Sequence, residues 1–163
     1  MLIVQQMERI STHITYSEAI KSDTAKRMQL RNTPTEEQLE NMTLLANKVF
    51  EPLREYFREP VRISSFFRSQ EVNKSVGGST TSQHTTGEAM DICAFASSGY
   101  TNADLFYYVL EKLVFDQLIW EFGTDRNPDW VHVSYSAKGK NRRKALKAIR
   151  VNGKVSYKPF AQS

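Results

Sequence analysis

The stretch that decides the fold is residues 82–93, which read SQHTTGEAMDIC. It begins as a polar loop containing His84, turns at Gly87 and continues as an apolar segment typical of a buried strand. Alternation along that strand places Asp91 on one face and Met90 on the other. A carboxylate that points into a buried sheet is costly unless a cation or a metal ion pairs with it. The stretch therefore predicts a strand that carries a paired or metal-bound aspartate.

A second segment, residues 127–134, reads NPDWVHVS and has a strand pattern of its own. Trp130 and His132 share one predicted face, so His132 can look into the same cleft as Asp91. Two imidazoles and one carboxylate form a ligand set found at catalytic zinc, where the fourth position is left for water. Asp129 precedes the strand, where its carboxylate could reach that water.

Spacing alone leaves other interpretations open. A histidine in a loop is more often a surface or hydrogen-bonding residue than a metal ligand, and Asp91 could instead pair with Arg68. His13 has no neighbours that suggest a ligand. Cys93 is the single cysteine, which excludes an internal disulfide and a cysteine-based zinc site. We interpret it as a small buried hydrophobe.

The flanking segments predict an α+β fold, with helices packed on a small, mainly antiparallel β-sheet. Expected helices are one or two short ones within 17–30, a long one from the cap Thr35 to Tyr56 or Phe57, and others over 69–75 and 101–113. Expected strands are 61–66, 89–94, 115–122 and 130–136. The tail, 143–151 and 155–157, fits strand or helix.

The 163 residues, 40% hydrophobic and 25% charged, suit one globular domain, 1–163. We divide it into a helical part (15–58), a metal-site core (61–136) and a basic tail (137–163). No run approaches the roughly 20 apolar residues of a membrane span. The first ten residues lack the pattern of a signal peptide. We therefore expect synthesis in the cytoplasm and another route to any site of action outside.

The formal net charge is +4, and much of the excess lies in residues 138–150. Such a surface could favour nucleic acid, anionic membrane or anionic cell-wall polymer. No aromatic residues interleave with the run as a nucleic-acid stacking platform requires. We therefore expect a solvated face and no nucleic-acid partner.

The motifs taken together resemble the M15 peptidase family, nearest to its short phage and prophage branch. They are Ser65-Phe66-Phe67-Arg68, Asn73, Val76-Gly77-Gly78, Ser82 to Asp91 in the pattern SxHxxGxAxD, Phe115 to Glu121, and Asp129 to Ser134. The resemblance extends from about Ile14 to Arg143. It implies the M15 (hedgehog-like) zinc peptidase fold. Members of the family include D-Ala-D-Ala carboxypeptidases, dipeptidases, and phage endolysins that cut L-Ala–D-Glu bonds.

The resemblance also implies roles for single residues. One zinc ion is expected on His84, Asp91 and His132. The general base of the family, three residues before the last histidine, falls on Asp129. Its carbonyl-polarising arginine falls on Arg68.

Four further positions join this expected site. Glu121 resembles an acidic position of the branch and is an alternative base, a partner of a ligand histidine or a surface charge. Substrate contacts are expected from Arg68, Ser82, Gln83 and Trp130, with Trp130 and Trp120 as cleft wall and core.

The implied function is hydrolysis of an amide bond in peptidoglycan stem peptides by a monomeric zinc peptidase. A role in phage or prophage lysis, or in cell-wall processing, would place it at the wall after release, or in the virion. The alternative is a non-catalytic relative that keeps the fold and binds cell wall or a virion partner. The bond cleaved, exo- versus endopeptidase action, the host and the physiological metal are left open by the sequence.

Overall fold

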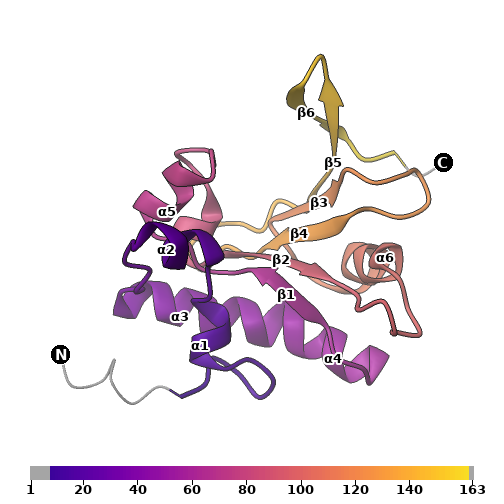
Figure 1. Cartoon of the computed structure of the whole chain (residues 1–163). Coiled ribbons are helices and arrows are strands. Elements are labelled where there is room, and N and C mark those ends of the chain that lie inside the picture. The colour runs from indigo at the N-terminus through magenta and orange to yellow at the C-terminus, as the bar shows by residue number, and fades with distance from the viewer. Residues whose placement is uncertain (1–7, 162–163) are drawn as a thin grey trace.

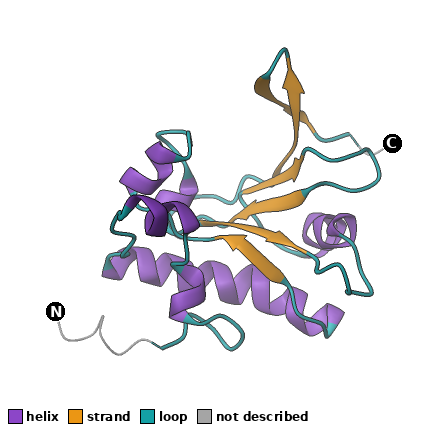
Figure 2. Cartoon of the chain, in the orientation of Figure 1, coloured by secondary structure: helices purple, strands orange, loops and turns teal. Residues whose placement is uncertain are grey.

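The computed structural model describes residues 8–161 and has the α+β architecture expected from the sequence (Figures 1 and 2). The first seven residues, including the apolar start of the chain, lie outside the described part. The helical elements are α1 (Tyr16–Ala19), α2 (Asp23–Met28), α3 (Glu36–Leu45), the π-helical turn η1 (Ala46–Phe50), α4 (Glu51–Phe57), α5 (Gln70–Ser75), the 3-10 turn η2 (Gln83–Thr86) and α6 (Asn102–Lys112). The strands are β1 (Arg62–Ser65), β2 (Ala89–Cys93), β3 (Gln117–Glu121), β4 (Trp130–Ser134), β5 (Lys144–Val151) and β6 (Lys154–Pro159).

Within the described residues, six strands form one sheet in the order β1-β2-β4-β3-β5-β6. Every neighbouring pair is antiparallel except β3–β5, which is parallel. The tail, which the sequence left open between strand and helix, forms the hairpin β5–β6 and rises away from the helices (Figure 1). The expectation of a small, mainly antiparallel sheet is confirmed.

The two faces of the sheet have different roles. Met90, Leu118 and Val133 lie side by side in the strand register and are completely buried. They pack against the long helix and α6, which lie on the same side of the sheet (Figure 2). The opposite face carries Asp91 and His132. The sheet therefore holds a closed core on one side and the polar residues of the candidate site on the other.

Helix starts follow the cap signals of the sequence. Thr35 caps α3 with Gln38 in a complete capping box, Thr101 caps α6, and Ser69 caps α5. The long helix expected from Thr35 to Phe57 is interrupted by the wider turn η1, which ends two residues before Pro52. Proline has no N–H to donate to the preceding turn and its ring clashes there. A π-helical turn relieves that conflict.

Asp116 joins the start of β5 to the loop that carries His84. It is 3% exposed and accepts hydrogen bonds from Arg142 Nε (2.8 Å), Arg142 Nη2 (2.7 Å) and Gln83 Nε2 (3.1 Å). The Arg142 hydrogen bonds and charge hold the pKa of this carboxyl below its usual range. Part of the basic run seen in the sequence is thus used to position the site.

We expect Asp116→Asn to lower the free energy of unfolding by about 2 kcal/mol at pH 7, because a charge-assisted pair is lost at a buried position. The folded-state pKa is depressed, so the carboxylate stabilises the fold above its unfolded pKa of about 4 and loses that effect as pH falls through the folded value. Urea unfolding of wild type and variant at pH 7 and at low pH measures both effects. Asp125→Asn, which removes an exposed partner of Lys147, is the control and should change little. An equal loss at both pH values would contradict the ion-pair explanation.

Candidate metal centre

Asp91 and His132 are brought together by the register of the sheet. They are direct partners in the antiparallel pair β2–β4. Asp91 Oδ1 lies 2.9 Å from His132 Nδ1. Direct cross-strand partners point to the same face, so the alternation read from the sequence leads to this contact.

His84 enters the same site from the turn η2, which precedes β2. Its Nδ1 donates a hydrogen bond to the Phe66 carbonyl oxygen at 2.6 Å, which leaves Nε2 as the lone-pair nitrogen of a neutral ring. Nε2 is buried without a hydrogen-bond partner and lies 3.3 Å from Asp91 Oδ1. Burial lowers the pKa of His84, which favours the neutral ring. The buried Nε2 lone pair and the Asp91 carboxylate would repel each other unless both bind one cation.

Gly87 lets the chain pass from this turn into β2. Its φ is +77°, and a Cβ at this position would lie 2.5 Å from the Gln38 carbonyl oxygen on α3. Only glycine combines this backbone conformation with so close an approach. Gly87 therefore allows the turn that carries His84 to pack closely against α3.

The three side chains fit a divalent metal ion. One ligand atom from each of His84, Asp91 and His132 lies within 4.8 Å of the others. Ligands that share a tetrahedral zinc ion at about 2.1 Å lie about 3.4 Å apart, close to the separation of His84 Nε2 and Asp91 Oδ1. The two histidines also hold the pKa of Asp91 far below its ordinary value, although burial opposes them. The site thus offers an ionised carboxylate and a neutral imidazole, the forms that bind metal.

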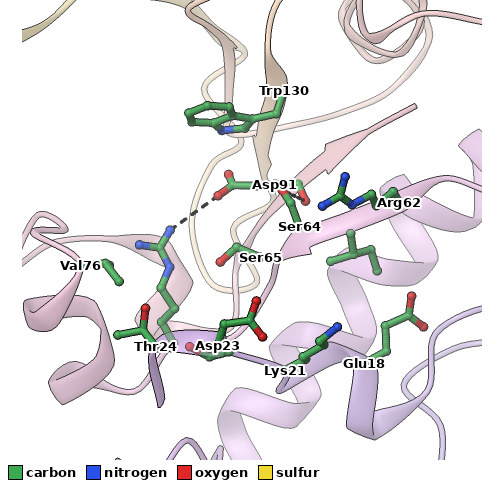
Figure 3. Close-up of a pocket in the computed structure, with 13 residues that line it drawn as sticks. Glu18, Lys21, Asp23, Thr24, Arg62, Ser64, Ser65, Val76, Asp91 and Trp130 are labelled. Carbon is green, nitrogen blue, oxygen red and sulfur yellow. Dashed lines mark hydrogen bonds and ion pairs between the residues drawn. The ribbon is translucent and has the colours of Figure 1, made fainter. Parts of the chain in front are cut away.

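Arg68 lies beside this triad. Its Nη2 is 3.7 Å from Asp91 Oδ2, the contact drawn as the dashed line in Figure 3, and its Nη1 donates to Asn73 Oδ1 at 3.3 Å. Its backbone N–H donates to the His84 carbonyl oxygen, and its buried Nε has no hydrogen-bond partner. The guanidinium is therefore held at the edge of the metal site, and it still has N–H groups that can donate hydrogen bonds to a ligand.

Glu121 and Asp129 occupy different places. Glu121 is 7% exposed and lines the same cleft as His84, Asp91 and His132. Burial raises its pKa to about 7, with Asp91 adding to the rise and His132 and Arg68 opposing it. Asp129 is exposed and lines a neighbouring cavity, which shares Phe122, Trp130 and Arg150 with the metal cleft.

A comparison with protein families identifies the family of this chain. The model of the family described as Peptidase M15 matches residues 12–134, three quarters of the chain. The chain belongs to the M15 peptidase family. A search of curated proteins gave no significant match.

M15 membership makes this chain a metallopeptidase of a zinc-dependent family. The matched range contains His84, Asp91, His132, Arg68 and both candidate bases, and it ends with β4. The hairpin β5–β6 lies beyond it. The expected roles of the individual residues stay predictions, but the structure gathers the three ligands and Arg68 in one place.

The other residues singled out in the sequence lie along the cleft, in the core or apart from both. Ser82, Gln83 and Trp130 all border the cleft that contains the triad, and their contacts with substrate stay a prediction. Trp120 is 1% exposed and belongs to the core. His13 lies apart and pairs with Glu51, its Nδ1 2.6 Å from Glu51 Oε2. Cys93 is buried and free, as expected.

Two cavities meet beside the metal triad, and Asp91 is the triad residue that borders both. The first, about 480 Å³, extends towards α1 and α2 and is lined by charged residues from both (Figure 3). The second, about 760 Å³, extends towards the β5–β6 hairpin. Arg68, Asp91 and Trp130 border both. Sequence reasoning could not find this cleft, because its walls come from distant parts of the chain.

Proposed function

We propose that this protein is a zinc-dependent endopeptidase that cleaves within peptidoglycan stem peptides. The observation that carries the proposal is that the cleft containing the metal triad meets a second cavity at Asp91, and each is large enough for peptide residues. Space on both sides of the reacting atoms suits a bond in the interior of a peptide. A carboxypeptidase would need one side closed around a terminal residue.

A zinc ion on His84, Asp91 and His132 would supply Lewis acidity and lower the pKa of a water molecule at the site. Glu121, on the same sheet face and in the same cleft, is the residue we assign to take the proton of the attacking water and return it to the leaving amine. Its burial supports a carboxyl group that exchanges protons near neutral pH. Asp129, the base implied by the family motif, lines the neighbouring cavity and is the alternative.

Arg68 is assigned to the developing negative charge on the carbonyl oxygen. A guanidinium with unused N–H groups next to the reacting centre stabilises such charge without reorganising. Its hydrogen bond to Asn73 and its contact with Asp91 fix it in place. The net positive charge favours approach to the anionic cell wall, so we propose lysis or wall processing as the setting.

The test is mass spectrometry of purified sacculi and defined muropeptides incubated with the protein, with chelator, and with chelator followed by zinc. We expect new ends inside the stem peptide that vanish with chelator and return with zinc. Release of single terminal D-alanine residues would make the enzyme a carboxypeptidase. Absence of cleavage by protein shown to carry zinc would reject the enzymatic role and favour a wall-binding relative.

A further inference from the structure

The hairpin β5–β6 forms one wall of the cleft, although it lies beyond the family-matched range. Ala148 on β5 is the partner of Glu121 on β3 and of Tyr157 on β6. Arg150 is the partner of Val155. Direct partners share a face, so these hairpin residues point to the side of the sheet that carries the metal triad.

An apolar and aromatic surface supports this wall. Ile119, Leu146 and Ala148 form a small buried cluster on the site face, with Phe122 packed against it. The Phe122 ring lies 5.5 Å from the Trp130 ring, and Trp130 borders the metal centre. The wall is thus a fixed continuation of the cleft.

Arg150 and Lys144, towards opposite ends of β5, are cations of the cleft that form no ion pair among the described residues. The Arg150 guanidinium lies 4.6 Å from the centre of the Phe122 ring, which orients it, and it lines the cleft. Over residues 8–161 it has no ion pair, whereas Arg142 is bound to Asp116 and Lys147 to Asp125. Its charge is therefore available to a ligand.

Tyr157 adds a hydroxyl donor to the same place. It is 54% exposed and lines the cleft with Arg150. The two residues are diagonal neighbours on the hairpin, a relation in which the Cα atoms lie about 7 Å apart. Their long side chains can therefore reach the same ligand group. A guanidinium and a phenol on an aromatic surface are suited to a carboxylate.

We propose that Arg150 and Tyr157 form a subsite that binds a carboxylate of the peptide segment lying over the hairpin, and so select acidic stem peptides over amidated ones. The inference rests on the proposed function, because it names the substrate class of that cleft. Arg150 donates paired N–H groups to the carboxylate and Tyr157 donates its O–H. Neither residue takes part in bond cleavage.

The experiment compares two stem tetrapeptides that differ only in whether the α-carboxylate of D-Glu is free or amidated. We expect wild type to favour the acid by about tenfold in kcat/KM, which corresponds to about 1.4 kcal/mol. Arg150→Met removes the guanidinium but keeps an unbranched side chain, and it should bring the ratio close to one through KM, with kcat retained. Tyr157→Phe should reduce the ratio by a smaller factor.

Lys158→Met is the matched control, because it removes one charge from the same hairpin on the opposite face. An unchanged ratio in Arg150→Met, or an equal fall in Lys158→Met, would overturn the subsite. Isothermal titration of both peptides into zinc-loaded wild type and Arg150→Met separates this inference from the proposed function. If wild type binds the acidic peptide selectively, Arg150→Met loses that selectivity and neither protein hydrolyses the peptide, the subsite is retained and the peptidase function is rejected. If the peptides are hydrolysed without selectivity for the acid, the peptidase function is retained and the subsite is rejected.

Discussion

The Glu121→Gln variant is expected to bind zinc like wild type and to lose about 10²–10⁴-fold in kcat, the usual contribution of a general base. The substitution keeps the shape of a side chain that is 7% exposed, so folding should be preserved. It removes the carboxylate that lines the cleft together with the metal triad. Steady-state kinetics on the cleaved muropeptide, with zinc content measured on the same preparation, gives both quantities.

Asp129→Asn is the decisive comparison, because the family motif implies Asp129 as the base. Asp129 is exposed and lines another cavity, so its variant should keep kcat within a few-fold of wild type. Loss of turnover in Asp129→Asn with retention in Glu121→Gln would restore the motif-based assignment. Such a result would also require the Asp129 side chain to reach the cleft on substrate binding.

Loss of a ligand should have the second large effect. We expect His84→Ala to abolish zinc binding and hydrolysis together, since two ligands remain where three converged. The variant also leaves the Phe66 carbonyl oxygen without its donor, which should cost about 1–2 kcal/mol of stability. Metal analysis after dialysis, activity and thermal unfolding measure the three consequences.

His13→Ala is the matched control, because His13 lies outside the site and pairs with Glu51. It should retain one zinc ion per chain and full activity. If His84→Ala retained zinc, the ligand assignment would be wrong even though the three side chains converge.

Much of the fold could be predicted because its signals are local. The cap Thr35 gave the start of α3, local patterns over 69–75 and 101–113 gave α5 and α6, and strand alternation placed Asp91 and His132 on one face. The π-helical turn had a signal as well, because Pro52 stands inside a helical pattern.

The rest depended on pairings between distant residues. The tail fits strand or helix by composition, and only its parallel pairing with β3 decides between them. The relative positions of Glu121 and Asp129 follow from the β3–β4 register, which sets Glu121 opposite Trp130 and leaves Asp129 beyond the strand. Counting residues back from His132 could not reveal that difference.

The two edge strands of the sheet determine whether copies of this chain can pair through their backbones. A long, flat, apolar edge strand invites backbone pairing with another molecule, and the devices that prevent it are irregular register, lysine and proline. At one edge, the β1–β2 pairing is irregular between Ile63 and Ser65. At the other, β6 carries Lys154 and Lys158 and ends in Pro159. The hairpin that lines the cleft therefore also disfavours backbone pairing between the sheets of two copies. This matters most where many copies of the enzyme gather on one surface.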